Sequence, residues 1–206
     1  MGVIFIVMIL VGGANLRQVL TCAAIGIPCI LLLMQVSGYS YFWERLTMDP
    51  LADPSDTTYQ TYQAILAIGS GGLWGKGFDH STQKYYYLPE AQNDFVYAIC
   101  CEEFGFIGCV FLLLLMSSII LRCIWVARRA CSPQSAYLVM GYAGMLLAQV
   151  GVNIAMCLYI FPVVGLTLPF VSYGGSSIIT MFAAMGIVSS VKMRSLPSWL
   201  RDRSKL

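Results

Sequence analysis

The sequence predicts an all-α membrane protein, a polytopic transmembrane helix bundle with one long loop on its outer side that carries an amphipathic helix. Of the 206 residues, 58% are hydrophobic and 11% are charged, whereas about a quarter of the residues in a soluble domain are charged. The mean hydropathy is +0.75. Most of the surface is therefore expected to contact lipid, and a net charge of only +2 argues against a nucleic-acid partner.

Five apolar segments are candidate spans of this single membrane domain. They are residues 2–13, 20–37, 95–126, 136–160 and 166–191. The first is only a partial span, because a helix needs about 20 residues to cross a bilayer. The last is interrupted by Pro169 and Gly174, and irregular backbone at membrane depth has to be buried in protein or line a polar cavity. The PFVSYGGSS stretch is therefore expected to pack inside the bundle.

Basic residues predict the orientation of these spans. They cluster between the first two segments, after the third segment and at the end of the chain: Arg17, Arg122, Arg128, Arg129, Lys192, Arg194, Arg201, Arg203 and Lys205. Strict alternation of spans places all three clusters on one side, as the positive-inside rule requires. Residues 192–206 then form a cytoplasmic tail, and residues 38–94 form an extracytoplasmic loop.

Two parts of the outer loop have recognisable local patterns. The YQTYQAILAI segment predicts an amphipathic helix whose interfacial face is available to Tyr59, Tyr62, Gln63, Ile65 and Leu66. The GSGGLWGKG segment that follows has five glycines, so its backbone can turn tightly or approach a ligand closely. This segment is not a phosphate-binding loop, because Gly77 follows Lys76 where a serine or threonine is required.

Acidic residues gather where the third span begins, at Glu90, Asp94, Glu102 and Glu103. Helix capping alone explains one of them, with Asn93 as N-cap and Asp94 in the first turn. A regular helix, however, also aligns Asp94 with Glu102 on one face, and acids inside a span usually face a polar cavity. A carboxylate there is suited to act as general base on a hydroxyl nucleophile, so Asp94 is the catalytic candidate and Glu102 a supporting intramembrane acid.

Other polar residues have competing explanations. Lys84 and Arg45 are cations that could hold a diphosphate, or they reach to lipid head groups instead. His80 is the single histidine and is expected to be solvated. Gln149 and Asn153 lie one turn apart in a span and are expected to hydrogen-bond between helices.

Three ordered segments resemble the signatures of the FtsW/RodA/SpoVE family of bacterial shape, elongation, division and sporulation proteins. They are YQTYQAILAIGSGGLWGKGF, STQKYYYLPEAQNDFVYAICCEEFGFIG and FPVVGLTLPFVSYGGSS. The resemblance implies a peptidoglycan glycosyltransferase of the bacterial cytoplasmic membrane that polymerises lipid II, an undecaprenyl-diphosphate-linked precursor. Because members are longer and this chain opens inside an apparent middle span, we expect it to be the C-terminal half of the family's bundle.

The resemblance also assigns roles to individual residues. The family's essential outer-face aspartate lies in an E-A-x-x-D-F segment, which puts it on Asp94 and the motif's glutamate on Glu90. The lysine of S-T-Q-K matches Lys84, with Gln83 beside it, and the arginine before the D-P-x-x-D-P turn matches Arg45. The predicted substrate-binding set consists of Glu90, Lys84, Gln83 and Arg45.

The resemblance and the chemistry together predict a mechanism. Asp94 removes the proton of a sugar 4-hydroxyl as this attacks the anomeric carbon, and Lys84 and Arg45 offset charge on the departing diphosphate. No cofactor is assigned from the sequence, and a divalent cation with unassigned ligands is the one candidate. The expected partners are a class B penicillin-binding protein, which is a transpeptidase, other divisome or elongasome proteins, and membrane lipid.

Two other function classes stay open. A lipid II flippase needs a polar path with charges deep in several spans, whereas the charges here gather at one outer mouth, which favours the enzyme. A non-catalytic scaffold for a wall transpeptidase is the third class. Within the family, the NDF and PVVGLTLPF segments favour the division branch over the elongation and sporulation branches, although no physical argument separates them.

Overall fold

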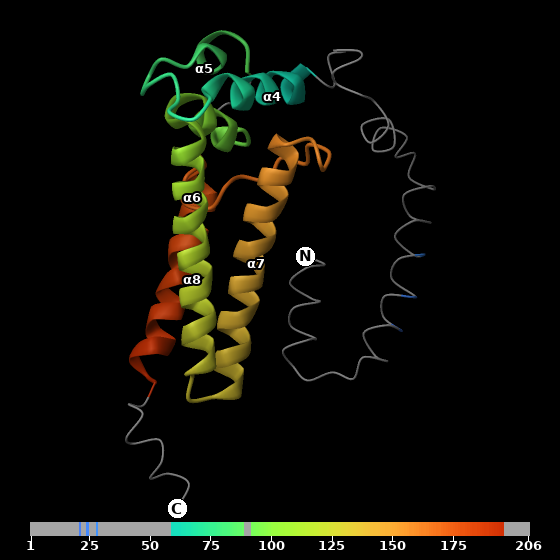
Figure 1. The fold of residues 1–206 in the computed structure, drawn as a ribbon. Coiled ribbons are helices and arrows are strands. Elements are labelled where there is room, and N and C mark those ends of the chain that lie inside the picture. Colours follow the sequence, from blue (N-terminus) through green and yellow to red (C-terminus); the bar gives the residue numbers. More distant parts are fainter. Residues whose placement is uncertain (1–20, 22–23, 25–27, 29–58, 89–91, 196–206) are drawn as a thin grey trace, which may run out of the picture.

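The computed structural model describes residues 59–88 and 92–195, together with the isolated residues 21, 24 and 28. Within that part of the chain all regular elements are helices (Figure 1). They are α4 (Tyr59–Gly71), α5 (Thr82–Tyr86), α6 (Val96–Arg128), α7 (Pro133–Cys157) and α8 (Gly175–Met193). The predicted all-α class is confirmed. The predicted spans 2–13 and 20–37 and most of the tail lie outside the described residues.

Three of these helices, α6, α7 and α8, are long and apolar enough to cross a membrane. They run alongside one another (Figure 1), and α8 contacts both α6 and α7. Large apolar side chains point out of this bundle along its length: Phe111, Leu114 and Phe182 are each at least 60% exposed. In water such a surface is a liability, but in a bilayer it is the face that lipid covers. The chain is therefore a membrane protein.

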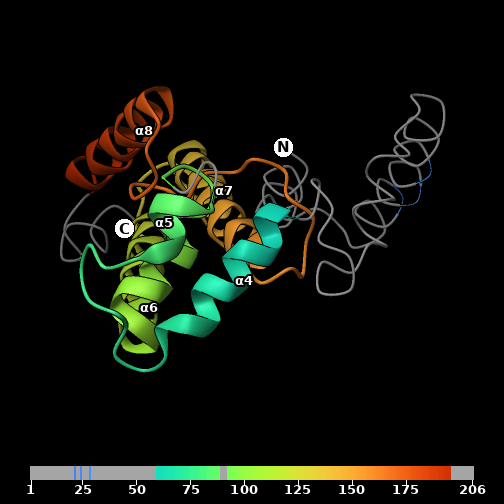
Figure 2. The ribbon, with the colours of Figure 1, turned by 90° about the horizontal axis from the view of Figure 1, so that it is seen from above.

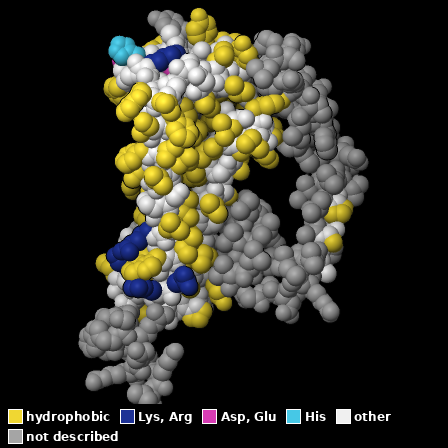
Figure 3. Space-filling model, viewed as in Figure 1, with side chains coloured by type: hydrophobic (Ala, Val, Ile, Leu, Met, Phe, Trp, Pro, Cys, Tyr) yellow, Lys and Arg dark blue, Asp and Glu magenta, His cyan; other side chains and the backbone are white. Residues whose placement is uncertain are grey.

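The two ends of the bundle differ in chemistry (Figure 3). The end at which α6 begins is covered by α4 and α5, which lie across it (Figures 1 and 2), and we call it the loop end. The opposite end, which we call the basic end, carries the cations of the last turns of α6 and α8 and the residues beside them: Arg122, Arg128, Arg129, Lys192 and Arg194.

The segment predicted as the last span, 166–191, is helical only in its second part. Helix α8 begins at Gly175, and the residues before it are turns and extended backbone. Leu168, Pro169 and Ser172 are buried, as expected for irregular backbone inside a bundle. The expectation that this stretch packs inside the bundle is wrong for Tyr173, whose accessible surface is 72% exposed.

Helix α4 packs on α6 through its small residues. Ala64 and Ala67 are completely buried and belong to the same core cluster as Ala98 of α6. Small side chains let two helices approach closely. Four of the residues proposed for the interfacial face are half-buried or exposed, so α4 directs them away from this contact: Tyr59, Tyr62, Ile65 and Leu66. Gln63 is buried, so the prediction is wrong for that residue.

Helix α6 is broken at Gly105, which has φ 67° and ψ −167°. The break separates a short first part, residues 96–104, from residues 106–128. The second part is about 34 Å long at 1.5 Å per residue, which is enough to cross a hydrocarbon core of about 30 Å. Glu102 and Glu103 therefore lie on the loop-end side of the break.

The glycine-rich segment fills this break with its own backbone. The N–H groups of Lys76 and Gly77 donate to the carbonyls of Glu102 and Glu103 at 2.9 and 3.0 Å. In return, the N–H of Phe106 donates to the carbonyl of Gly72 at 2.9 Å. The close backbone approach that the glycines predict is real, but in this structure the glycines approach helix α6.

We expect Gly75→Ala to destabilise the protein by about 3 kcal/mol. A Cβ at Gly75 lies 2.2 Å from the carbonyl oxygen of Glu103, and the residue has φ 79°. The matched control is Gly69→Ala in α4, where a Cβ meets no atom within 4 Å, so this variant is expected to be neutral or slightly stabilising. Unfolding in mixed micelles measures both, and equal stability of the two variants contradicts the backbone packing described here.

Candidate functional site

Asp94 lies in a turn, residues 92–94, that precedes helix α6. The helix begins at Val96 with Phe95 as its cap residue, and no side-chain hydrogen bond caps it. The expectation that Asn93 caps the helix and Asp94 occupies its first turn is therefore wrong. Because Asp94 is outside the helix, its predicted alignment with Glu102 on one helical face is also wrong.

A buried amide of α7 holds this turn in place. Asn153 has no exposed surface, and its side-chain nitrogen donates to the carbonyls of Asp94 at 2.8 Å and Leu166 at 2.7 Å. The prediction that this residue hydrogen-bonds between helices is wrong in its partners, since both carbonyls belong to segments outside the helices. For Gln149, one turn away, the buried side-chain oxygen has no hydrogen-bond partner among the described residues.

The segment between α7 and α8 forms the other wall around Asp94. The N–H of Tyr173 donates to the carbonyl of Gln92 at 2.9 Å. Gly165 has φ 68°, and a Cβ built on it comes within 3.6 Å of a carboxylate oxygen of Asp94. The half-buried carboxylate of Asp94 thus lies beside a glycine backbone that leaves room next to it.

Glu102 is completely buried beneath the start of α5. Its carboxylate accepts hydrogen bonds from Lys76 Nζ at 2.6 Å and from the side chain and N–H of Thr82 at 3.0 and 3.2 Å. The hydroxyl of Ser81 and the N–H of Gln83 also donate to it. Glu102 was expected to face a polar cavity together with Asp94, but it is instead enclosed by the loop that covers α6.

Lys76 is a cation of the loop end whose ion pair with Glu102 was not predicted from the sequence. Its ion pair with Glu102 depends on the docking of residues 72–77 into the break of α6. The pair joins residues 26 positions apart in the sequence. A lysine in a glycine-rich segment gives no local signal of such a partner.

Lys84 lies between two carboxylates. Its ammonium is 3.3 Å from an oxygen of Asp79 and 3.3 Å from an oxygen of Glu103. Burial favours the neutral amine, but the hydrogen bonds to Asp79 and Glu103 outweigh it and raise the pKa of Lys84 above its ordinary value. The pKa of Asp79 is lowered by hydrogen bonds from Tyr85 and Lys84. Lys84 therefore carries a full positive charge at neutral pH.

A cavity of about 360 Å³ opens beside Lys84. Its polar lining includes Lys84, Glu103 and Gln92, and its apolar lining includes Val96, Ile99, Val171 and Ile178. A cation and apolar side chains in one cavity suit a ligand with an anionic head and an apolar tail, although the carboxylate of Glu103 lies 3.3 Å from the same ammonium. Asp94 is not among the described residues that line this cavity.

Of the remaining predicted site residues, the structure describes Gln83 only. Arg45 and Glu90 lie outside the described residues. Gln83 donates its N–H to Glu102, and its buried side-chain oxygen has no hydrogen-bond partner in the part of the chain that the structure describes. Over the same part, no three His, Cys, Asp or Glu side chains are placed to hold a metal ion, so the candidate divalent cation finds no ligand set there.

A comparison with known protein families identifies the family of this chain. The sequence profile of the FtsW/RodA/SpoVE family, described as cell cycle proteins, matches residues 1–196. The chain belongs to the FtsW/RodA/SpoVE family. The resemblance stated from the three signature segments is thereby confirmed.

Individual FtsW/RodA/SpoVE members are similar along most of this chain. Stage V sporulation protein E of Bacillus subtilis (strain 168) is 39% identical over 92% of the chain and 52% of its own length. Peptidoglycan glycosyltransferase MrdB of Escherichia coli (strain K12) is 43% identical over 74% of the chain and 42% of its own length. The chain spans about half the length of the curated relatives it matches.

Solved FtsW/RodA/SpoVE-like structures have the same fold. A chain from a structure on coordination of polymerization and crosslinking by a peptidoglycan synthase complex matches with a TM-score of 0.67 and 30% identity, over 91% of this chain and 52% of that one. A crystal structure of a mutant of the rod-shape-determining protein RodA of Thermus thermophilus matches with a TM-score of 0.51 and 37% identity, over 66% of this chain and 41% of that one.

We expect Asn153→Leu to destabilise the protein by about 3 kcal/mol, because two buried carbonyls lose their donor. The matched control is Gln149→Leu, on the same helix one turn away, which removes an amide whose oxygen is already unpaired among the described residues. Its effect should stay below about 1 kcal/mol. Thermal unfolding in detergent compares them, and an unaffected Asn153→Leu protein contradicts the role given to this amide.

Proposed function

We propose that this chain carries the catalytic end of a peptidoglycan glycosyltransferase, which polymerises lipid II into glycan strands during bacterial cell division or cell-shape maintenance. Several relatives are named peptidoglycan glycosyltransferases, which supports the proposal. The observation that carries it is the position of Asp94. It is a carboxylate in a turn at the membrane-surface end of the bundle, fixed by α7 and lying beside Gly165.

Asp94 is proposed as the general base. It takes the proton of a sugar 4-hydroxyl, whose oxygen bonds to the anomeric carbon of a second lipid-linked sugar. The bond from that carbon to the diphosphate breaks, and its electron pair leaves with the diphosphate. Unlike in glycoside hydrolysis, no second carboxylate need protonate the leaving group, since a diphosphate leaves readily. A single displacement of this kind inverts the anomeric centre.

Lys84 is proposed to bind the diphosphate. Its contact with Glu103, which is buried, would persist, whereas Asp79 is 62% exposed in its side chain and such a surface pair is weak. A diphosphate oxygen can therefore replace Asp79 beside the ammonium, and the apolar wall of the adjoining cavity suits the polyprenyl chain. Arg45, Glu90 and Gln83 complete the proposed binding set on the strength of the family resemblance.

The proposed orientation follows from charge. The basic end faces the cytoplasm under the positive-inside rule, which places the C-terminus in the cytoplasm and the loop end with Asp94 outside. Lipid II polymerisation requires this arrangement, since the glycan strand grows outside the cell membrane. A class B penicillin-binding protein is the proposed partner, supported by the similarity to a chain of a peptidoglycan synthase complex, with other divisome or elongasome proteins.

The flippase hypothesis has less support from the described residues. Their buried charges, Glu102 and Glu103, both lie at the loop end and are both paired with lysines. A transport path needs polar groups along the depth of the bundle. A scaffold needs no catalytic carboxylate, so substitution of Asp94 should impair the enzyme but leave a scaffold function unchanged.

We expect Asp94→Asn to reduce polymerisation of labelled lipid II by about 100-fold or more, because the general base is lost. The fold should persist, since Asn153 binds the backbone carbonyl of Asp94 and not its side chain. The assay uses the full chain in proteoliposomes with Asp202→Asn, in the predicted cytoplasmic tail, as control. Polymer formed by Asp94→Asn at the normal rate removes this residue from the mechanism. If the starting protein forms no polymer, translocated monomer supports the flippase, and the absence of both products supports the scaffold.

We expect Lys84→Gln to lower kcat/KM for lipid II by about 100-fold, because the leaving diphosphate loses a preorganised cation. Lys205→Gln, a matched charge loss in the predicted tail, should keep the normal rate. Polymerisation at several lipid II concentrations measures both. An unchanged rate for Lys84→Gln places the diphosphate elsewhere.

A further inference from the structure

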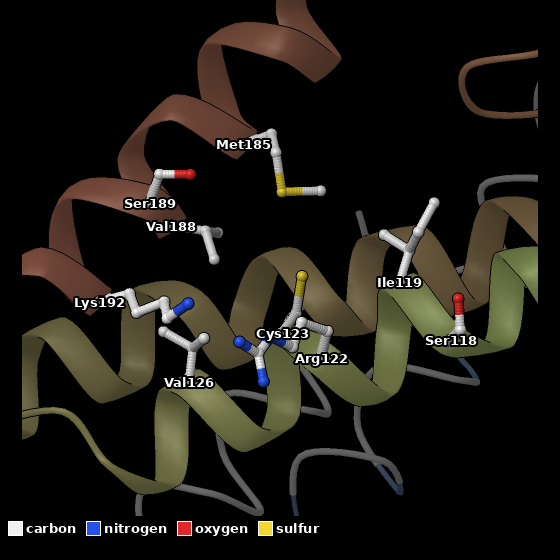
Figure 4. Close-up of a pocket in the computed structure, with 9 residues that line it drawn as sticks. All are labelled: Ser118, Ile119, Arg122, Cys123, Val126, Met185, Val188, Ser189 and Lys192. Carbon is white, nitrogen blue, oxygen red and sulfur yellow. The ribbon is translucent and has the colours of Figure 1, made fainter.

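A second cavity, of about 500 Å³, lies between α6 and α8 near the basic end (Figure 4). Arg122 of α6 and Lys192 of α8 line it together with Ile119, Val126, Met185 and Val188. Figure 4 shows Ile119 toward one end of the cavity and Lys192 toward the other, with Arg122 and Met185 between them. The cavity is therefore a mainly apolar groove whose lining includes two cations.

Among the described residues, no protein anion is paired with these two cations. No aspartate or glutamate lines it, and the salt bridges among the described residues involve neither Arg122 nor Lys192. Arg122 instead lies over the ring of Trp125, at 4.3 Å from its centre. Two like charges beside an apolar wall repel each other more than they would in water, so an anion between them stabilises the groove.

The positive-inside rule explains why cations gather at this end, and long basic side chains reach to head groups from many helix ends. That explanation requires no cavity between them. Here the charges face a groove on the outside of two membrane-spanning helices, and most of its lining is apolar. A free phosphate ion would leave the apolar walls uncovered, whereas a lipid with a phosphate head covers both parts.

We propose that the groove between α6 and α8 binds an anionic phospholipid of the leaflet at the basic end. The phosphate lies between Arg122 and Lys192, and an acyl chain lies along Ile119, Met185 and Val188. This site is at the opposite end of the bundle from Asp94, so it is independent of the proposed catalytic function.

Trp125 provides a reporter beside the groove. The chain has four tryptophans, and replacing Trp43, Trp74 and Trp199 by Phe leaves Trp125 alone in the full chain. The protein is placed in phosphatidylcholine nanodiscs that contain a small share of either brominated phosphatidylglycerol or brominated phosphatidylcholine. Bromine quenches tryptophan fluorescence at short range, so stronger quenching by phosphatidylglycerol at equal content reports preferential binding.

The double variant Arg122→Gln/Lys192→Gln should lower the preference for phosphatidylglycerol by about tenfold or more, given the usual contribution of each basic residue. Its matched control, Arg128→Gln/Arg194→Gln, loses the same charge at the same end, also from exposed residues, but these residues do not line the groove. The preference should then stay within about twofold of the starting protein. Unfolding temperatures show that both variants are folded.

Lys192→Gln alone leaves Arg122 on Trp125, and should lower the preference by about threefold. Equal quenching by the two lipids in the starting protein overturns the proposal. So does an equal loss in the two double variants, which indicates general attraction to an anionic surface. Inorganic phosphate that abolishes the preference also overturns it, because the groove then binds a free ion.

Discussion

The fold of the loop end depends on the exchange of backbone hydrogen bonds between the glycine-rich segment and the break in α6. A break leaves N–H and C=O groups without helical partners, and burying them unpaired is costly. Residues 72–77 supply the partners at Glu102, Glu103 and Phe106. Only glycine permits this approach, since a Cβ at Gly71 would lie 1.9 Å from the carbonyl oxygen of Cys101.

The electrostatics of the loop end follow from this docking. It brings Lys76 and the start of α5 over Glu102, and it places Lys84 beside Glu103. A buried carboxylate without such partners would be strongly destabilising. The two acids therefore do not form a polar channel into the membrane; they anchor the loop that carries the proposed diphosphate-binding lysine. Asp94 has a separate support, the amide of Asn153 on α7.

A structural feature of this protein can be predicted from the sequence when the residues that determine it are close together in the sequence. The helices α6 and α7 follow from apolar runs of sufficient length, which are continuous in the sequence. The glycines predict a close backbone approach, but not to which partner. The alignment of Asp94 with Glu102 fails because it assumes one unbroken helix, and the capping pattern around Asn93 does not reveal that α7 already binds the carbonyl of Asp94.

Composition and the order of apolar runs are sufficient to establish a helical membrane protein and its basic end, because solvent preference is a property of each segment alone. The partners of the polar side chains are decided by tertiary structure. Asn153 reaches Asp94 across 59 positions of the sequence and Lys76 reaches Glu102 across 26. No local periodicity encodes such pairs, which exist only because helix packing brings distant backbone segments within hydrogen-bonding distance.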